Sequence, residues 1–529
     1  MPDPRALNFK NEPLTDFSQA AHRQAMEAGL SKVRAQLGQV YPLVIGGKNL
    51  KARQTFQSIN PSRSQEVIGI VQNADTKIAD RALAAASQSF TSWSQVPVFN
   101  RAEVLRKMAK ILRGRKFEFC AWLIYEVGKS WGEADADVAE AIDFLEYYAE
   151  LALLPPPALT AVPGEFNEYR YLPLGPVVVI PPWNFPLAIL VGMTSAALVT
   201  GNTVVLKPSS QSPVIAAKFV ELAREAGLPN GVLSLLTGAG GTIGNFLVKD
   251  PRTRMIAFTG SKAVGLRINA LAAQIFPGQK WVKRVIAEMG GKNAIIVDES
   301  ANVDEAAKGV SASAFGYQGQ KCSACSRLYV HQKVYDKFLE KFLAIVKEIR
   351  QGPADVWENG MGPVISAGSH KEINRYIAIG KKEGRLLTPS PQPSPHGRGR
   401  SEATGEGYFI PPTVFDRLPK NSRLFREEIF GPVLAIQKMK TFDEGLLAAN
   451  ATDYGLTGAV YSQNPDHIAA SREHFFCGNL YINRKCTGAM VGGHPFGGFN
   501  MSGTDSKAGG PDYLLLFTQA KCVSEKPCF

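Results

Sequence analysis

Short apolar runs rich in β-branched residues alternate with amphipathic segments along the middle and C-terminal parts of the chain. Such runs are typical of strands buried on both faces of a parallel sheet, and the segments between them of helices that cover those faces. From about Gly175, the predicted strands cover residues 177–180, 203–206, 232–236, 255–258 and 294–297. A second series follows Cys322, at residues 328–330, 459–461 and 480–482. The pattern predicts an α/β protein with two sheet-forming regions.

Residues 388–407 differ from the rest of the chain in composition. The segment is rich in Pro, Ser, Gly and Arg, and apart from its prolines and Ala403 it has no apolar side chain. It cannot bury enough apolar surface to offset the entropy lost on ordering. We therefore predict an exposed, flexible insertion that takes no part in the chemistry.

The composition is that of an ordinary soluble protein, with 529 residues, 45% hydrophobic and 20% charged, which is long enough for two or three domains. The net charge is +12, from 59 Lys and Arg against 47 Asp and Glu. The basic residues are scattered and form no stripe with interleaved aromatic residues, so nucleic-acid binding is not expected. A basic surface suits small anionic substrates and cofactors that carry phosphate.

No segment approaches the roughly 18 consecutive apolar residues of a membrane span, and the N-terminus has no apolar run after a basic segment. We predict a cytoplasmic protein that does not bind membranes. The seven cysteines are odd in number and sparse for a chain of 529 residues, so free thiols are expected rather than a disulfide framework.

The segment GQKCSACSR, residues 319–327, places Cys322 and Cys325 three positions apart. A structural zinc site needs a second close pair of ligands, which the sequence does not supply, so no metal site is predicted. A thioredoxin-like redox pair would follow a strand, whereas this pair follows a polar, helical segment. A nucleophilic cysteine needs a base and oxyanion donors, which Glu288 in AEMGGKN and Asn184 in PPWNFP can supply. The residues alone leave open that Glu288 faces solvent at the start of a strand.

Two glycine-bearing turns follow predicted strands. GAGGTIG, residues 238–244, could hold a pyrophosphate on free backbone N–H groups, but it lacks the G-x-G-x-x-G spacing and could also be a plain turn. FTGSKAVG, residues 258–265, ends the next strand at the same edge of the sheet, where ligands of parallel sheets bind. EVGKS, residues 126–130, resembles the end of a P-loop, but Leu123 stands where that motif needs glycine, so an NTPase is not predicted.

Longer motifs occur together and in one order along the chain. They are PWNFP at residues 182–186, KPS at 207–209, FTGSKAVG at 258–265, EMGGKN at 288–293, GQKC at 319–322, EEIFGPV at 427–433 and PFGGFNMSG at 495–503. Together they resemble the NAD(P)-dependent aldehyde dehydrogenase superfamily, and the resemblance extends from about residue 41 to the C-terminus.

The resemblance implies an α/β architecture, the aldehyde dehydrogenase fold. Its parts would be a doubly wound dinucleotide-binding domain at residues 1–160 and 176–290, an α/β catalytic domain at residues 291–490, and a small bridging β element at residues 161–175 and 505–529. In that superfamily the bridging element completes the sheet of a neighbouring subunit. A homo-oligomer is therefore implied.

The resemblance also implies an oxidoreductase mechanism. Cys322 would attack the aldehyde carbon, and the side-chain amide of Asn184 and the backbone N–H of Cys322 would hold the oxyanion. A hydride would pass to the nicotinamide, and Glu288 would activate the water that hydrolyses the resulting thioester. Cys325 would be a packed bystander one helical turn from the nucleophile, and oxidation could join the two thiols if the backbone permits.

The implied cofactor is NAD. The resemblance assigns its binding to Pro182, Trp183, Lys207, Ser210, Gly240, Gly260, Ser261, Gly265, Glu428 and Phe430. Lys207 would bind the adenosine ribose, Ser261 the pyrophosphate and Glu428 the nicotinamide ribose. Many NAD-preferring members have glutamate where this chain has Ser210. Loss of that carboxylate removes repulsion toward a 2′-phosphate, so NADP would be tolerated alongside NAD.

More specific pieces of sequence narrow the substrate. They lie at residues 11–17, 127–149, 319–327 and 483–514. They resemble the members that oxidise L-glutamate 5-semialdehyde, formed from 1-pyrroline-5-carboxylate, to L-glutamate in proline degradation. The resemblance assigns substrate binding to Phe185, Ser323, Gly488, Ala489 and Phe496. Ser323 and the N–H groups of Gly488 and Ala489 would hold the α-carboxylate, unless residues 487–489 are only a turn.

Two other functions remain open. Another semialdehyde, such as succinate semialdehyde, would use the same catalysis but would not need a site for an α-carboxylate. A non-enzymatic structural or thiol role would need neither Cys322 as nucleophile nor Glu288 as base.

Overall fold

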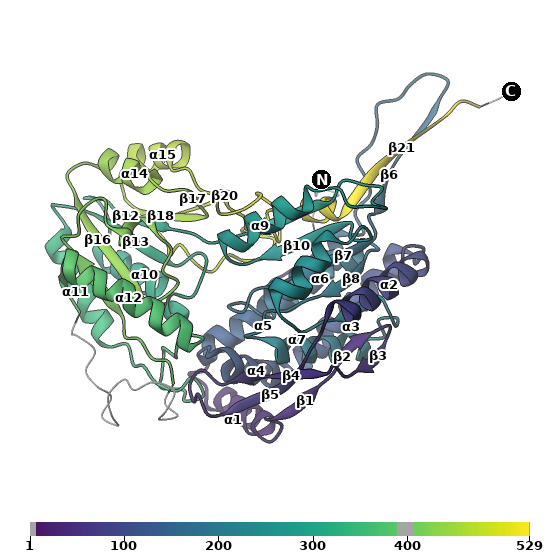
Figure 1. The fold of residues 1–529 in the computed structure, drawn as a ribbon. Coiled ribbons are helices and arrows are strands. Elements are labelled where there is room, and N and C mark those ends of the chain that lie inside the picture. The colour runs from purple at the N-terminus through teal and green to yellow at the C-terminus, as the bar shows by residue number, and fades with distance from the viewer. Residues whose placement is uncertain (1–6, 389–406, 528–529) are drawn as a thin grey trace.

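The computed structural model describes residues 7–388 and 407–527, which form two lobes side by side (Figure 1). The predicted insertion at residues 388–407 falls almost wholly on residues 389–406, outside the described residues. Each lobe is built around a seven-stranded sheet. In the part of the chain that the structure describes, no helix has the length and apolar character needed to cross a membrane, and no group of acidic, His or Cys side chains could hold a metal ion.

The first sheet has the strand order β11-β10-β7-β8-β9-β2-β3. Its strands are β2 Leu43–Ile45, β3 Lys48–Leu50, β7 Pro176–Ile180, β8 Thr203–Leu206, β9 Leu233–Leu235, β10 Met255–Thr259 and β11 Arg284–Glu288. Strands β11 to β9 run parallel, and β2 and β3 add antiparallel pairs. The predictions for β7, β8, β9 and β10 are confirmed. The sequence analysis missed β11, an edge strand whose first two residues are not buried.

Helices cover both faces of the first sheet. They are α2 Thr76–Trp93, α3 Val98–Gly114, α4 Lys116–Val127, α5 Trp131–Leu151, α6 Ala188–Val199, α7 Pro213–Glu225, α8 Asn245–Lys249 and α9 Lys262–Ala272. Alternate residues of β7 show the arrangement: Val177 and Val179 pack among α3 to α7, whereas Val178 packs among α2, α8 and α9. Because successive strand residues point to opposite faces, both faces are buried, as a doubly wound sheet requires.

The second sheet has the order β14-β15-β16-β13-β12-β18-β19 and is parallel except for β14. Its strands are β12 Asn293–Val297, β13 Cys325–His331, β14 Arg385–Leu386, β15 Thr413–Asp416, β16 Val433–Met439, β18 Thr457–Tyr461 and β19 Asn479–Ile482. The helices around it are α10 Val303–Phe315, α11 Tyr335–Lys347, α12 Ala367–Glu383, α13 Arg423–Arg426, α14 Phe442–Asn450 and α15 Pro465–His474. All strands predicted after residue 290 are confirmed here.

Smaller elements complete the two lobes. They are α1 Ala20–Arg34, the three-stranded sheet of β1 Gln39–Tyr41, β4 Gln54–Ile59 and β5 Val67–Asn73, and the pair β17 Tyr454–Gly455 and β20 Phe499–Asn500.

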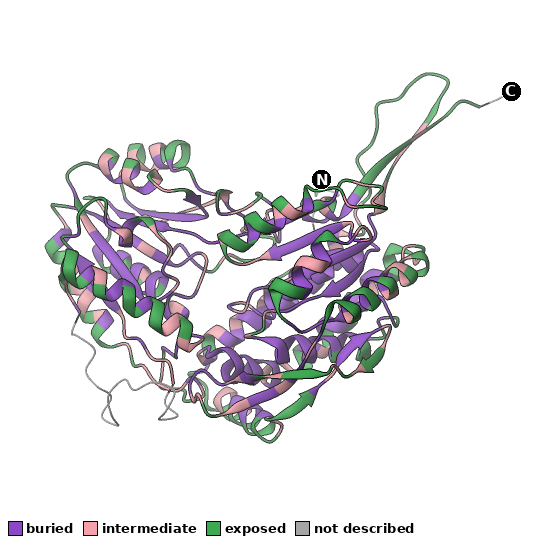
Figure 2. Ribbon diagram, viewed as in Figure 1, coloured by how far each residue is buried: buried purple, intermediate pink, exposed green. Residues whose placement is uncertain are grey.

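An arm of two strands extends from the body of the molecule (Figure 1). Strand β6 Phe166–Pro173 pairs antiparallel with β21 Thr518–Glu525, from Pro173 opposite Thr518 to Phe166 opposite Glu525. Most of the arm is exposed or only half-buried (Figure 2). The C-terminal segment thus joins the strand near residue 168, as the resemblance implied. The domain boundaries and the role of the arm in an oligomer stay predictions.

Candidate active site

Four neighbouring parallel strands of the first sheet end in the motif segments. Residues 181–186 follow β7, residues 207–210 follow β8, residues 238–244 follow β9, and residues 260–265 follow β10. Because parallel strands end at the same edge of their sheet, these segments meet along one edge. The predicted position of both glycine-bearing turns is therefore confirmed.

Lys207 reaches toward the turn that follows β9. Its buried ammonium group donates to the carbonyl oxygen of Pro208 at 3.2 Å. A Cβ on Gly244 would lie 3.8 Å from Cδ and Cε of Lys207, so the lysine stem runs beside this turn. Burial lowers the pKa of Lys207 to about 8. No carboxylate of the described residues pairs with this amine, which therefore suits the oxygens of a bound ligand.

Each of the two glycine-bearing turns leads into the N-terminus of a helix. Gly240 is exposed at the start of a short π-helix, Gly240–Gly244, and Ser261 is the exposed N-cap of α9. No side chain caps either helix, so the first N–H groups of α9 are available to an anion. A Cβ on Gly260 would lie 2.6 Å from the ring of Phe258, and a Cβ on Gly265 would lie 2.5 Å from Sδ of Met289. A side chain at either position would therefore require its neighbour to shift.

Glu428 and Phe430 reach this edge from the second lobe. Glu428 accepts a hydrogen bond from the backbone N–H of Gly291 at 2.8 Å, and a Cβ on Gly290 would lie 2.2 Å from its other carboxylate oxygen. Burial raises the pKa of Glu428. The rings of Phe430 and Trp183 meet edge to face with their centroids 5.5 Å apart. Residues of both lobes therefore lie together where β7 ends.

Residues 320–324 form the nucleophile loop, which carries the candidate nucleophile Cys322, and they follow α10 and a 3-10 helix, Gly316–Gly319. Tyr317 and Gln318 have left-handed backbones, with φ of 48° and 57°, and long-range contacts hold them there. The Tyr317 hydroxyl donates to the carbonyl oxygen of Val127 at 2.8 Å, and Gln318 donates to those of Gly128 and Pro363. α10 ends where Gly316 leaves the helical region, with ψ of 130°, and the left-handed residues that follow lead into a loop in which Cys322 is half-buried.

The placement of Cys325 on a helix is wrong. Cys325 is the first residue of β13, because α10 has already ended at Phe315 and the left-handed Tyr317 and Gln318 keep the chain from resuming a regular helix before the loop. The prediction that it is packed is confirmed: it is buried, and its thiol donates to the carbonyl oxygen of Arg327 at 3.4 Å and contacts the thiol of Cys486. Oxidative pairing of Cys325 with Cys322 stays untested.

Two asparagine side chains fix the nucleophile loop. Asn184 is buried, and its amide donates to the carbonyl oxygen of Gln320 at 3.1 Å. Asn293 donates to the carbonyl oxygens of Cys322, at 2.7 Å, and Ala324, at 2.9 Å. Among the described residues, neither the second amide hydrogen of Asn184 nor the backbone N–H of Cys322 donates to a protein acceptor. Both donors are free for an oxyanion.

Glu288 ends β11 and is buried, so the alternative that it faces solvent is wrong. Its carboxylate accepts three hydrogen bonds, from the backbone N–H of Gly498 at 3.1 Å, the N–H of Ser506 at 3.3 Å and the Ser506 hydroxyl at 2.7 Å. Burial raises the pKa of Glu288 to about 7, against the opposing effect of these hydrogen bonds. A carboxyl group with this pKa can take up and release a proton near neutral pH.

The thiol of Cys322 is neutral in this environment. Burial, and then the negative charges of Glu428 and Glu288, raise its pKa to about 12. The backbone N–H of Ser323 acts in the opposite direction. A nucleophilic role for Cys322 would therefore require a base that removes its proton before or during attack, because the thiolate is the reactive form.

A buried cation lies behind Phe185. Lys129 lies 3.9 Å from the ring centroid of Phe185 and 4.1 Å from that of Tyr317. Its ammonium is 3.5 Å from the carboxylate of Asp137, and neither side chain is exposed. The segment that resembled a P-loop thus packs beneath Phe185. Burial raises the pKa of Glu140 on α5 to about 8, and this carboxyl group lies within electrostatic range of Cys322.

The turn at residues 487–489 lies close to the nucleophile loop. Cys486, directly before it, donates its thiol to the carbonyl oxygen of Ser323 at 3.3 Å. Gly488 has a φ of 74°, a conformation that suits glycine, and it is exposed. Phe496, half-buried, pairs with Ala508 through two backbone hydrogen bonds of 2.8 Å.

Comparison with known proteins decides the family. The model of the aldehyde dehydrogenase family matches residues 49–523. The chain belongs to this family. This match confirms the resemblance to aldehyde dehydrogenases and the fold that it implied.

Relatives of this aldehyde dehydrogenase match it over almost its full length. It is 52% identical over 519 residues to the 1-pyrroline-5-carboxylate dehydrogenase of Geobacillus thermodenitrificans, covering 98% of this chain and 99% of that protein. The Bacillus subtilis protein of the same name is also 52% identical, over 521 residues. A crystal structure of 1-pyrroline-5-carboxylate dehydrogenase from Thermus with bound NAD superposes with a TM-score of 0.94 at 47% identity, covering 99% of this chain and all of that one.

Several residues of this aldehyde dehydrogenase that touch the site were missed by sequence reasoning. They are Asn293, Tyr317, Gln318, Ser506 and Glu140. Asn293 stands inside the EMGGKN motif, which could have drawn attention to it. The others act on partners far away in the chain: Ser506 and Glu288 are 218 positions apart.

Proposed function

We propose that this aldehyde dehydrogenase oxidises L-glutamate 5-semialdehyde, formed from 1-pyrroline-5-carboxylate, to L-glutamate with NAD, the second step of proline degradation. The observation that carries the substrate is the identity of 52%, over 98% of the chain, to a protein named 1-pyrroline-5-carboxylate dehydrogenase. The free N–H groups of the turn at Gly488 support it, because they suit a substrate with a carboxylate at its far end.

The first step assigned to the chain is attack by Cys322 on the aldehyde carbon. The carbonyl oxygen gains negative charge as the bond forms, and two free donors, the Asn184 amide and the N–H of Cys322, would stabilise it. Asn293 holds the carbonyl oxygen of Cys322 and so fixes the loop against which the oxyanion is bound. Preorganised donors of this kind need no rearrangement as the charge develops.

Glu288 would supply the base for deacylation. Its pKa of about 7 leaves a large ionised fraction at neutral pH, and its buried position keeps the carboxylate basic. It would take a proton from the water that attacks the thioester on Cys322, and the thiol would leave as L-glutamate forms. Ser506 holds the carboxylate between these steps.

The residues at the edge of the first sheet fit a dinucleotide. Lys207 is a buried amine without a carboxylate partner among the described residues, and the N-terminus of α9 offers free N–H groups beside Ser261 and Gly260. NAD, when bound, supplies the acceptor for the hydride. The other residues that we assign to the dinucleotide site are Pro182, Trp183, Ser210, Gly240, Gly265, Glu428 and Phe430. We assign them to binding the two riboses, the pyrophosphate and the nicotinamide.

Ser210 is proposed to let NADP replace NAD. Its side chain is exposed just after β8 and brings no negative charge to the ribose site. Ser210→Glu would repel a 2′-phosphate, so the ratio of kcat/KM for NAD to that for NADP should rise at least about tenfold, or ~1.4 kcal/mol. Ser210→Gln is the neutral control and should leave the ratio near that of the parent. Equal ratios in the two variants would contradict the assignment.

The substrate's far end would bind between three segments. Ser323 and the N–H groups of Gly488 and Ala489 would hold the α-carboxylate, while Phe185 and Phe496 would line the aliphatic part. The contact of Cys486 with the carbonyl oxygen of Ser323, at 3.3 Å, ties the carboxylate turn to the nucleophile loop.

We also propose a homo-oligomer in the cytoplasm. The exposed arm of β6 and β21 would complete the sheet of a neighbouring subunit, because its edges carry unpaired backbone groups. Free thiols at all the cysteines of the described residues suit a reducing compartment.

The direct test is a comparison of kcat/KM for L-glutamate 5-semialdehyde and for succinate semialdehyde, each with NAD. Glutamate semialdehyde should be preferred at least about tenfold, because only this substrate can use both the carboxylate turn and the full length of the pocket. Equal values would overturn the substrate and favour a broader semialdehyde dehydrogenase.

A further inference from the structure

Arg484 lies behind the turn that we assign to the substrate carboxylate. One nitrogen of its guanidinium, Nη2, donates to the carbonyl oxygens of both Thr487, at 3.3 Å, and Gly488, at 3.0 Å. The arginine therefore draws two successive carbonyl groups to the same side of the chain.

The planarity of the peptide group fixes the consequence. The described chain has no cis peptide, and in a trans peptide the N–H points opposite to the carbonyl of the preceding residue. The carbonyl of Thr487 shares its plane with the N–H of Gly488, and the carbonyl of Gly488 shares its plane with the N–H of Ala489. Both N–H groups thus point away from Arg484. Neither donates to a protein acceptor among the described residues. Such a pair of N–H groups binds an anionic oxygen.

Arg484 is itself held on two sides. Its Nη1 lies 3.1 Å from Nε2 of His494, and its guanidinium carbon lies 4.4 Å from the ring centroid of Tyr481. A planar, two-sided donor held in this way can fix two carbonyl groups at once, which a lysine ammonium on a flexible stem cannot do as well.

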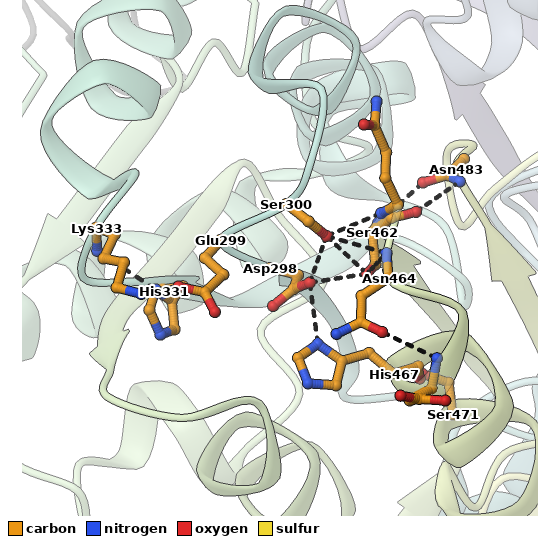
Figure 3. Close-up of polar contacts among 12 residues, drawn as sticks. Asp298, Glu299, Ser300, His331, Lys333, Ser462, Asn464, His467, Ser471 and Asn483 are labelled. Atoms are coloured by element: carbon orange, nitrogen blue, oxygen red, sulfur yellow. Dashed lines mark hydrogen bonds and ion pairs between the residues drawn. The ribbon is translucent and has the colours of Figure 1, made fainter.

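The residue before Arg484 anchors the whole segment. Asn483 has a φ of 53°, and its side chain makes two hydrogen bonds with the backbone of Ser462, accepting from its N–H at 3.0 Å and donating to its carbonyl oxygen at 2.9 Å (Figure 3). These bonds fix the point where the chain leaves β19. The arginine and the turn start from this fixed point.

We propose that Arg484 is a positioning residue for carboxylate selectivity: it orients the peptide groups of Thr487–Gly488 and Gly488–Ala489 so that their N–H groups converge on the substrate carboxylate. The inference deepens the proposed function and rests on it. Arg484 touches neither the nucleophile nor the cofactor residues in the contacts described above, so its effect should be confined to substrates that carry the carboxylate.

The test compares two aldehydes of equal carbon length, L-glutamate 5-semialdehyde and pentanal, with NAD. Arg484→Met should raise KM for the semialdehyde and the inhibition constant of L-glutamate about tenfold each, or ~1.4 kcal/mol, with kcat unchanged. Its kcat/KM for pentanal should equal that of the parent. Arg484→Lys keeps the positive charge but loses the planar guanidinium. Its KM for the semialdehyde should lie between that of the parent and that of Arg484→Met.

Lys485→Met is the matched control, because Lys485 also lies beside Gly488, with Nζ 3.5 Å from the position a Cβ would take there, yet the hydrogen bonds to the two carbonyl groups come from Arg484. It should change the KM for the semialdehyde by less than about twofold; an effect equal to that of Arg484→Met would mean that net charge is responsible and would overturn the inference. Equal losses on both aldehydes in Arg484→Met, or no loss on either, would also overturn it. If that variant fails to fold, as judged by its thermal midpoint and NAD binding, Arg484→Lys decides on the same criteria. Failure of the proposed function would show in the parent enzyme, as a lack of preference for the semialdehyde over pentanal.

Discussion

At the residue scale, the site depends on carboxyl and thiol groups that share one poorly solvated region. Burial raises the pKa of Cys322 to about 12 and that of Glu288 to about 7, and each negative charge makes the other less favourable. Only one of these groups readily carries a charge at a time. Such mutual exclusion of charge suits a mechanism in which the Cys322 thiol and the Glu288 carboxylate act in successive steps.

Burial raises the pKa of Glu288, and the hydrogen bond from Ser506 opposes that rise. Because this bond favours the carboxylate and lowers its pKa, Ser506→Ala should raise the pKa of Glu288 above its present value near 7. Deacylation needs the ionised form, so the acidic limb of the kcat profile should move to higher pH. Thr504→Val is the control, since Thr504 bonds to the backbone N–H of Ala287 and not to Glu288. An unmoved limb in Ser506→Ala would exclude Glu288 as the titrating group.

The sequence indicated the candidate reacting residues but not the residues that hold them in place. Cys322 and Glu288 belong to short motifs that could be recognised locally, whereas Ser506 contacts Glu288 across 218 positions of chain. The error about Cys325 has the same origin. The residues before it have helical character, but α10 ends at Phe315, and contacts of Tyr317 and Gln318 with distant carbonyl oxygens hold the left-handed turn that follows.

At the element scale, many buried parallel strands were predictable because both of their faces are apolar. The edge strand β11 and the largely buried parallel strands β15 and β16 were not predicted. The two sheets also contribute opposite edges to the candidate site. The segments that we propose to bind the cofactor follow the strands of the first sheet, whereas the loop with Cys322 precedes β13 of the second. The carboxyl edge of the second sheet is instead closed by a polar network around Asp298 (Figure 3).

Asp298 should be a stabilising residue with no direct part in catalysis. Its buried carboxylate accepts hydrogen bonds from the hydroxyls of Ser300, at 2.6 Å, and Ser462, at 2.8 Å, and lies 3.0 Å from Nδ1 of His467. Asp298→Ala should lower the free energy of unfolding by about 2–3 kcal/mol, measured by denaturant titration, with kcat retained. Glu299→Ala, which removes a neighbouring exposed carboxylate, should change the unfolding midpoint little.

The loss in Asp298→Ala should depend on pH. Burial acts to raise the pKa of Asp298, but the hydrogen bonds from Ser300, His467 and Ser462 outweigh it and lower the pKa below its ordinary value. A lowered pKa in the folded state means that the carboxylate stabilises the protein above its unfolded pKa of about 3.9, and that this stabilisation is lost as the pH falls through the folded value. A variant as stable as the parent at neutral pH would refute the role of this network.

At the scale of the whole molecule, the arm is the feature least explained by a single chain. β6 and β21 pair with each other along eight positions, yet all of their residues except Thr518 are exposed or only half-buried, with Phe166 at 63% exposure. An isolated two-stranded ribbon is marginally stable in water, so a partner sheet would account for it. The arm could be located in the sequence only through the resemblance to aldehyde dehydrogenases, because its composition does not distinguish it from other polar strands.

Deleting residues 519–529 should therefore dissociate the oligomer. The deletion removes β21 beyond Thr518 and leaves β6 without its partner, so light scattering should report the mass of one chain or of a smaller assembly. Deleting residues 526–529 leaves β21 intact and should keep the mass of the parent. The same mass for both truncated proteins would exclude the arm as the contact between subunits.

We propose that L-glutamate 5-semialdehyde is oxidised through a thioester on Cys322 that Glu288 helps to hydrolyse. Rapid mixing of Glu288→Gln with NAD and the semialdehyde separates these two steps. We expect a burst of NADH equal to the number of active sites, a steady rate about 10²–10⁴-fold below that of the parent, and a glutamyl adduct on Cys322 in the quenched protein. Cys322→Ala should bind NAD but give neither burst nor adduct. A burst from Cys322→Ala, or full steady turnover by either variant, would rule out this mechanism.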